Sequence, residues 1–255
     1  MRVHLVQTDI AWHDAPTNCR RVVALLSNAD VRPDDLVVLP EMFASGFTMD
    51  LAASTAGDAT VSWCSGLARE RRCYLLAGLV RQTRDGKGRN LAVLFAPDGA
   101  ESACYQKVHP FFVNESDCYE PGHEVIVVPV NDWRLAPLVC YDLRFPELFR
   151  AASARGAELM VVIANWPIAR VEHWLTLLRA RAIENQAYVV GVNRVGRDPE
   201  LLYPGRSVVV DPLGVVIADA GAEQRVLTAS LDRTLLLEWR SRFPVLADRR
   251  FRESG

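Results

Sequence analysis

The chain has 255 residues, of which 50% are hydrophobic and 24% are charged, as in an ordinary globular protein and unlike a fibrous or disordered one. At about 150 residues per domain, this length allows one large domain or two small ones. The 29 basic and 31 acidic residues give a formal net charge of -2, so no long-range positive field is available and nucleic acid is not expected as a partner.

Taken in chain order, short β-branched runs and longer helical patterns predict a mixed α/β chain. The predicted strands are Val3–Gln7, Leu36–Leu39, Tyr74–Leu79, Asn90–Ala96, Ala103–Lys107, Val125–Val128, Leu135–Val139, Leu159–Ile163, Tyr188–Asn193, Ser207–Val210 and Val215–Ala218. The predicted helices are Thr17–Ser27, Val61–Glu70, Pro146–Arg155 and Val171–Asn185.

Two turn sequences, Asp85-Gly86 and Asp211-Pro212-Leu213-Gly214, are of the kind that reverses neighbouring strands. The sheets are therefore expected to be mixed rather than purely parallel. No long Gly/Ser-rich linker and no internal repeat interrupts the sequence. We expect a single domain over residues 1–255.

The sequence begins without the continuous apolar core of a signal peptide, and its apolar runs are only as long as strands. We therefore expect a cytoplasmic protein without a membrane partner. The six cysteines are scattered and form no C-x-x-C pair, which favours free thiols. No H-E-x-x-H motif or His/Cys cluster occurs, so no metal site is expected.

In three places an apolar strand leads directly into a reactive polar residue. The first is Leu36–Leu39, followed by Pro40 and Glu41, which delivers a carboxylate to the strand's carboxyl end. Active sites of α/β folds usually lie at such ends. Glu41 is therefore a candidate general base, although an isolated glutamate there is more often a surface residue that begins a loop.

The second place is the strand Ala103–Lys107, which puts an ammonium group just before Pro110. A lysine there can stabilise developing negative charge, or it can simply be solvated. The third is Leu135–Val139, which leads into Cys140 at a strand-to-helix turn. At such an elbow, backbone N–H groups can hold an oxyanion and a nearby cation can lower the thiol pKa, whereas a buried structural cysteine is the alternative.

Together these residues resemble the Glu-Lys-Cys signature of the nitrilase, or carbon-nitrogen hydrolase, superfamily in order and spacing. The resemblance rests on Leu39-Pro40-Glu41, on Lys107 and on the segment from Cys140 to Pro146, and it covers essentially the whole chain. The later segments resemble the ω-amidase-like branch of that superfamily: Ala164–Pro167, Ala180–Gly196, Gly205–Ser207 and Asp211–Gly214.

The resemblance implies a thiol-dependent hydrolase that needs no metal or organic cofactor. Glu41 would take the proton of Cys140, and the thiolate would attack an amide carbonyl to give a thioester that water then hydrolyses. Lys107 and the backbone N–H of Tyr141 would stabilise the oxyanion. The loss of such a donor costs about 3 kcal/mol, so Lys107→Ala is expected to reduce turnover roughly a hundredfold or more.

Members of the superfamily often carry a second glutamate near the nucleophile. Glu115 and Glu120 both fit, and we favour Glu115, which lies eight residues after Lys107 and could orient that lysine or the substrate amide. Trp166 could form a wall of the pocket, and Arg170 could meet a substrate carboxylate.

Other polar residues near these motifs have less support for a chemical role. Asp142, Arg144 and Glu147 are expected to anchor the turn after the nucleophile by hydrogen bonds. His109 and His173 would permit a papain-like Cys-His pair. Neither has the sequence context of such a pair, and Glu41 with Lys107 explains more of the pattern.

The implied fold is a single four-layer α-β-β-α sandwich with two mixed central sheets, assembled as a homodimer to which the helix Val171–Asn185 could contribute. The favoured activity is hydrolysis of a small ω-amide of a 2-oxo acid, such as 2-oxoglutaramate or 2-oxosuccinamate. Deaminated glutathione or an N-carbamoyl compound would use the same three residues, and a nitrile is less favoured. A non-catalytic binding module and a redox-sensing thiol are the alternatives of a different class.

Overall fold

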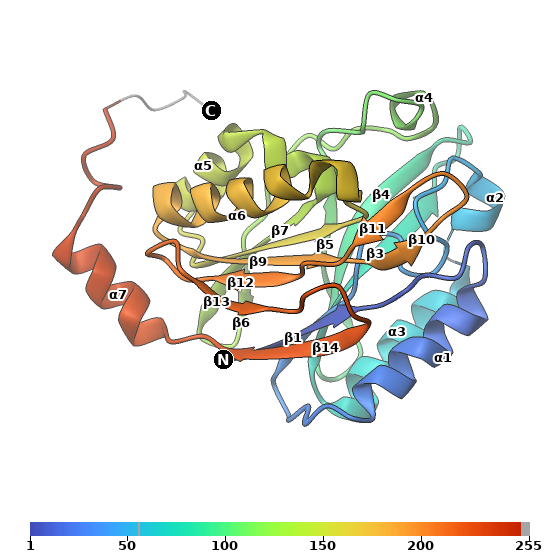
Figure 1. Cartoon of the computed structure of the whole chain (residues 1–255), viewed down its shortest axis with the longest axis horizontal. Helices are drawn as coiled ribbons and strands as arrows, with labels where there is room; N and C mark the ends of the chain where they lie inside the picture. The colour runs from blue at the N-terminus through green and yellow to red at the C-terminus, as the bar shows by residue number, and fades with distance from the viewer. Residues whose placement is uncertain (56, 251–255) are drawn as a thin grey trace.

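The computed structural model describes residues 1–55 and 57–250, in which two six-stranded sheets face each other (Figure 1). The first sheet has the order β14-β1-β2-β3-β4-β5. Its strands are β1 (Arg2–Gln7), β2 (Leu36–Val38), β3 (Tyr74–Gln82), β4 (Gly88–Phe95), β5 (Glu101–Gln106) and β14 (Arg225–Ser230).

The second sheet has the order β13-β12-β9-β8-β7-β6, and β10 and β11 form a separate hairpin. The bounds are β6 (Val128–Val130), β7 (Trp133–Val139), β8 (Leu159–Ala164), β9 (Tyr188–Asn193), β10 (Val195–Arg197), β11 (Leu202–Pro204), β12 (Val208–Val210) and β13 (Val216–Asp219). In each sheet the three central strands are parallel, and every outer strand pairs antiparallel with its neighbour. The prediction of mixed sheets is thus confirmed.

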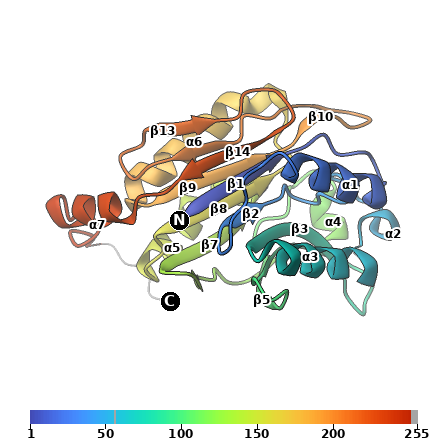
Figure 2. The ribbon, with the colours of Figure 1, turned by 90° about the horizontal axis from the view of Figure 1, so that it is seen from below.

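Helices cover the outer face of each sheet (Figures 1 and 2). The α-helices are α1 (Ala15–Leu26), α2 (Leu51–Ser54), α3 (Asp58–Arg71), α4 (Glu115–Cys118), α5 (Pro146–Ala154), α6 (Val171–Asn185) and α7 (Arg233–Arg242), and the short 3-10 helices are η1 (Cys140–Arg144) and η2 (Ile168–Arg170). α1 and α3 lie on the first sheet, and α5 and α6 lie on the second. Within the described ranges, no helix combines the length and the hydrophobicity that crossing a membrane requires.

The central strands are buried on both faces, because each sheet lies between the other sheet and a helix layer. In β8, Leu159, Val161 and Ile163 belong to the core between the two sheets, whereas the alternate residues Met160 and Val162 belong to the core beneath α5 and α6. A third core packs the first sheet against α1 and α3. The predicted four-layer α-β-β-α sandwich is confirmed.

The observed elements differ from the predicted ones mainly at the edges of the sheets. The helix Val171–Asn185 has the predicted bounds, but β6 begins at Val128 rather than Val125, because Val125 turns into the core beneath the helices. The sequence analysis missed β10, β11, β14 and α7, as well as the short helices α2, α4, η1 and η2. β14 alternates only weakly between buried and exposed positions and pairs with β1, at the other end of the chain.

Candidate active site

The three predicted residues follow strands that end at the same edge of the sandwich. β2 and β3 are parallel, and β5 has the same direction because it is antiparallel to β4, which is antiparallel to β3. Glu41 lies beyond the end of β2, Lys107 follows β5 directly, and Cys140 follows β7. Gly78 of β3 allows this approach, since a Cβ at that position would lie 2.5 Å from the Cα of Glu41.

Lys107 lies between two buried carboxylates. Its Nζ is 3.0 Å from Oε1 of Glu41 and 2.8 Å from Oε2 of Glu115, and all three side chains are at most 1% exposed. Asn90 of β4 donates hydrogen bonds to both carboxylates, at 2.8 and 2.9 Å. Of the two candidates for the second glutamate, Glu115 is therefore the one in the site, whereas Glu120 pairs with the half-exposed Arg89.

This arrangement separates the pKa values of the two carboxyl groups. Burial alone would raise the pKa of Glu41, but the Lys107 ammonium and hydrogen bonds from Asn90, Lys107 and the Asn165 backbone lower it below its ordinary value. Burial raises the pKa of Glu115, and the nearby charge of Glu41 adds to this effect. Burial disfavours the charged form of Lys107, yet Glu115 and Glu41 outweigh it and raise its pKa. The lowered pKa of Glu41 favours its ionised form, which a general base requires.

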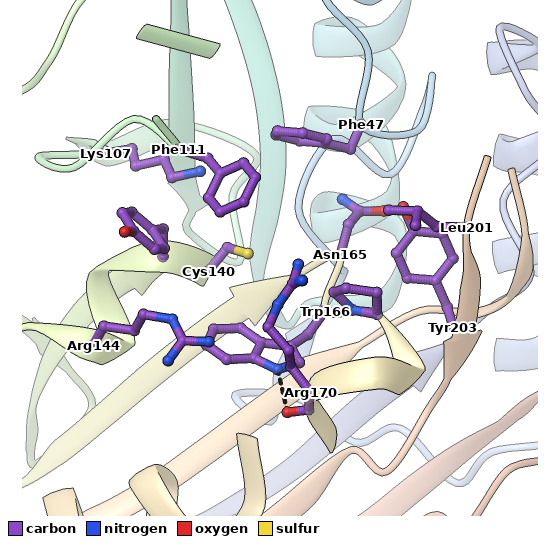
Figure 3. Close-up of a pocket in the computed structure, with 12 residues that line it drawn as sticks. Phe47, Lys107, Phe111, Cys140, Arg144, Asn165, Trp166, Arg170, Leu201 and Tyr203 are labelled. Atoms are coloured by element: carbon purple, nitrogen blue, oxygen red, sulfur yellow. Dashed lines mark hydrogen bonds between the residues drawn. The ribbon is translucent and has the colours of Figure 1, made fainter. Parts of the chain in front are cut away.

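Cys140 occupies a sharp turn between β7 and η1. Its backbone has a φ of +47°, in the left-handed region that residues other than glycine rarely adopt, and such strain is concentrated at functional sites. Figure 3 shows its Sγ in the pocket, on the same side as the Lys107 ammonium. The turn thus presents the thiol to any bound molecule.

The thiol is protonated in the resting site. Burial raises the pKa of Cys140 well above its ordinary value, and the negative charge of Glu41 adds to this effect, whereas Lys107 opposes it. The nearby cation does not lower this pKa below its ordinary value, because burial, together with the charge of Glu41, outweighs Lys107. An attack by sulfur therefore requires a base to remove the proton, and Glu41 is the adjacent ionised group.

This protonation state predicts the pH dependence of thiol alkylation. A thiol with a raised pKa gains thiolate only as the pH rises towards and beyond its ordinary value of 9.0. The rate of iodoacetamide labelling at Cys140, measured by mass spectrometry of its peptide, should therefore increase steadily with pH and show no plateau below pH 9.0. A plateau near neutral pH would mean that Cys140 is a stable thiolate.

Asn165, which follows β8 directly, fixes the orientation of the Glu41 carboxylate. Its backbone N–H donates to Oε2 of Glu41 at 2.9 Å, and its side-chain amide donates to the Glu41 carbonyl at 2.7 Å. The sequence analysis assigned no role to Asn165 or Asn90. A polar residue within an apolar strand was the available signal for Asn90, since β4 reads GRNLAVLF.

The pocket above the thiol is lined mainly by aromatic and cationic side chains. Its lining residues are Phe47, Lys107, Phe111, Cys140, Tyr141, Arg144, Asn165, Trp166, Pro167, Arg170, Leu201 and Tyr203 (Figure 3). The predicted Tyr141, Trp166 and Arg170 are all among them. The sequence analysis missed Phe47, Phe111, Leu201 and Tyr203, which lie on loops and on the β10–β11 hairpin. Only tertiary structure brings them to the site.

Two guanidinium groups face this pocket. Arg170 lies over the ring of Phe111 at 5.8 Å, and its backbone carbonyl accepts a hydrogen bond from the Trp166 indole. Arg144 stacks on Trp166 at 4.9 Å and contacts His173. The expectation that Arg144 only anchors the turn is therefore wrong, because its side chain lines the pocket.

The other nearby residues behave as structural elements. Asp142 is buried and accepts hydrogen bonds at the turn, as expected, and Glu147 is exposed at the start of α5. His109 contacts Asp142 and His173 contacts Arg144, and neither histidine is among the pocket-lining residues. Among the described residues, no group of three or more His, Cys, Asp or Glu side chains is placed to bind a metal ion.

Comparison with known proteins agrees with this geometry. The carbon-nitrogen hydrolase family model matches residues 2–241. The omega-amidase YafV of Escherichia coli K12 is 40% identical over 252 residues, which is 97% of this chain and 96% of the relative. The 2-oxoglutaramate amidase of Paenarthrobacter nicotinovorans is 40% identical over 230 residues, or 85% of this chain and 78% of the relative.

Solved structures show the same likeness. One is a CN-hydrolase superfamily protein of Xanthomonas campestris with an arsenic adduct in its active site. Its TM-score is 0.93 at 37% sequence identity, and the match covers 100% of this chain and 99% of that protein's chain. Another is a variant amidase of Nesterenkonia sp. AN1 in which acrylamide is added to the active-site cysteine. Its TM-score is 0.82 at 29% identity, and the match covers 96% of this chain and 98% of that chain. The chain therefore belongs to the nitrilase (carbon-nitrogen hydrolase) superfamily, in its omega-amidase-like branch, and is an amidase that hydrolyses carbon-nitrogen amide bonds.

Proposed function

We propose that the protein hydrolyses the terminal amide of a small 2-oxo acid, such as 2-oxoglutaramate or 2-oxosuccinamate, through a thioester on Cys140. The observation that carries this proposal is the combination of the Glu41-Lys107-Cys140 cluster with a pocket lined by Arg144 and Arg170. The cluster supports amide hydrolysis, and the arginines support a substrate that carries a carboxylate. The names of the omega-amidase and 2-oxoglutaramate amidase relatives agree with this class.

In the acylation step, Glu41 takes the Cys140 proton and the sulfur attacks the amide carbon. The resulting oxyanion is held by the Lys107 ammonium and the backbone N–H of Tyr141. Glu41 then gives its proton to the amide nitrogen, the carbon-nitrogen bond breaks and ammonia leaves. The acyl group remains on the sulfur as a thioester.

In the deacylation step, Glu41 takes a proton from a water molecule that attacks the thioester carbon. The second tetrahedral intermediate uses the same two oxyanion donors and collapses with loss of the Cys140 sulfur, to which Glu41 returns the proton. The step releases the dicarboxylate and restores both the ionised Glu41 and the resting thiol. Glu115 stays beside Lys107 throughout and keeps the ammonium in place.

A panel of amides tests the substrate assignment. Ammonia release is measured with 2-oxoglutaramate, 2-oxosuccinamate, deaminated glutathione, an N-carbamoyl amine and a simple nitrile, and Cys140→Ala serves as the control. Selective turnover of the two 2-oxo amides that is lost in the variant supports the proposal. Activity only on deaminated glutathione or the N-carbamoyl amine would retain the mechanism and contradict the substrate.

Arg170 is the residue that we expect to bind the substrate carboxylate. Its guanidinium extends into the pocket (Figure 3), and the described residues offer it no carboxylate partner within ion-pair distance. A charged hydrogen bond contributes about 1.5–3 kcal/mol, so Arg170→Ala should raise KM for 2-oxoglutaramate by roughly 10- to 100-fold.

The control for this prediction is an uncharged amide of similar length. Its kcat/KM should be the same in the wild type and in Arg170→Ala, because it has no carboxylate to lose. Arg170→Lys should recover only part of the affinity, since an ammonium cannot bind a carboxylate with two parallel hydrogen bonds. An equal loss for both amides would show that Arg170 shapes the pocket rather than binding the carboxylate.

We further propose that residues 1–255 act as one domain in a homodimer located in the cytoplasm. The shared core between the two sheets supports a single domain. All six cysteines are free, which is typical of a reducing compartment. The apolar side chain of Ile183 is exposed on α6, which supports a contact between the two subunits through this helix. Light scattering of the wild type and of Ile183→Glu tests the dimer.

A further inference from the structure

Asp142 is a buried carboxylate for which amide hydrolysis, as described above, has no use. It lies two residues after Cys140 in η1 and is 0% exposed. Burying an ionised carboxylate is costly unless hydrogen bonds compensate it. The donors that compensate Asp142 come from two segments that carry the reacting groups.

One set of donors comes from both sides of Lys107. The Tyr105 hydroxyl donates to Oδ2 of Asp142 at 2.8 Å, and the backbone N–H of His109 donates to Oδ1 at 2.9 Å. The His109 ring nitrogen Nδ1 lies 3.1 Å from the same Oδ1. Tyr105 and His109 are two residues before and two residues after Lys107. The carboxylate therefore holds the lysine segment at two points.

The other contact is made at the nucleophile turn. The backbone N–H of Val139, immediately before Cys140, donates to Oδ2 of Asp142 at 3.1 Å. The His109 ring also stacks on Phe145, at the far end of η1, with ring centres 3.6 Å apart. Val139 and Phe145 thus flank the strained backbone at Cys140. Val139 is connected to the Lys107 segment through Asp142, and Phe145 is connected to it through the His109 ring.

We propose that Asp142 is a positioning residue for the hydrolysis, because its carboxylate fixes the Lys107 segment against the Cys140 turn. The oxyanion donors, the Lys107 ammonium and the Tyr141 N–H, belong to these two segments. A fixed relation between them allows both donors to reach one oxyanion without reorganisation. This inference rests on the proposed roles of Cys140 and Lys107.

The substitution Asp142→Asn tests this role with almost no change in volume. The four donors are divided between the two oxygens, and an asparagine offers only one acceptor atom. Its NH2 group would face at least one N–H or O–H donor, so the hydrogen bonds on one of the two oxygen positions of Asp142 must break. A displacement of about 1 Å at a reacting group can reduce the rate by roughly 100-fold.

Asp35→Asn is the matched control. Asp35 is also buried, accepts from the backbone N–H of Arg32 and lies 2.8 Å from the ring nitrogen Nε2 of His4. It precedes β2, whereas Glu41 lies beyond the other end of that strand. Its substitution therefore makes a comparable structural perturbation away from the site.

We expect Asp142→Asn to lower kcat for 2-oxoglutaramate by about 100-fold and to leave KM within about threefold, whereas Asp35→Asn keeps the wild-type kcat. A kcat for Asp142→Asn close to wild type, or an equal loss in Asp35→Asn, would overturn the inference. If Asp142→Asn does not fold, Tyr105→Phe tests the inference instead, because it removes one hydrogen bond between Asp142 and the segment that carries Lys107. Its kcat should then fall severalfold at constant KM, and an unchanged kcat would also overturn the inference.

The Cys140→Ala variant, measured with the same substrate, separates this inference from the proposed function. If Cys140→Ala retained turnover, the proposed mechanism itself would be wrong. If Cys140→Ala is inactive and Asp142→Asn is fully active, the mechanism stands and only the positioning role fails.

Discussion

Cys140→Ala is expected to abolish ammonia release, with a reduction in kcat of at least about 10⁵-fold, because loss of the nucleophile removes the whole covalent route. The pocket and its arginines remain, so binding of 2-oxoglutaramate should persist. Isothermal titration calorimetry with the inactive variant checks binding, and a coupled ammonia assay checks turnover.

Cys104→Ala is the matched cysteine control for this experiment. Cys104 is exposed on β5 and does not line the pocket. Its loss should leave kcat unchanged. Turnover by Cys140→Ala above about one thousandth of the wild-type rate would contradict covalent catalysis at this residue, since the loss of a catalytic nucleophile typically lowers kcat by about 10⁶-fold.

Lys107→Ala is expected to combine a large loss of activity with a loss of stability. The missing oxyanion donor alone costs roughly a hundredfold in turnover. In addition, the variant leaves Glu41 and Glu115 buried side by side without a cation, which typically costs about 3–5 kcal/mol in the free energy of unfolding. Burial would then raise the Glu41 pKa with only the hydrogen bonds from Asn90 and the Asn165 backbone to oppose it, so the base would be easier to protonate. Urea unfolding and kcat measured on the same preparation check both effects.

The double variant Lys107→Ala/Glu115→Gln distinguishes the two effects. Removing one of the unpaired carboxylates should restore part of the stability. It should not restore turnover, because the oxyanion donor is still absent. If Lys107→Ala is as stable as the wild type, the Lys107 ammonium does not compensate the buried charge of Glu41 and Glu115, and this prediction is wrong.

Local sequence patterns predicted most of the strands and the mixed sheets and indicated Glu41, Lys107 and Cys140 as candidates, whereas the four-layer arrangement and the roles of these residues came from the family resemblance. The strands before Glu41, Lys107 and Cys140 are continuous apolar runs, and each reactive residue stands where its run ends. The strand β14 is different, since it is defined by pairing with β1, whose residues lie more than 200 positions away. No local pattern carries that information.

The electrostatics of the site could not be predicted from local patterns. A cation near Cys140 suggested a lowered thiol pKa, but the pKa depends first on burial and then on two carboxyl groups and one ammonium that three separate segments bring together. The role of Arg144 was missed for a similar reason. Its position in the turn is local, but its stacking on Trp166 depends on the loop that follows β8.

Partitioning of the acyl-enzyme between water and hydroxylamine tests the central claim most directly. Glutaramate and the monomethyl ester of glutarate, which lack the 2-oxo group that hydroxylamine would convert to an oxime, would give the same thioester on Cys140. The account predicts that both substrates yield hydroxamate and free acid in the same ratio at a given hydroxylamine concentration. Different ratios, or ammonia release from the amide without any hydroxamate, would contradict hydrolysis through a common thioester.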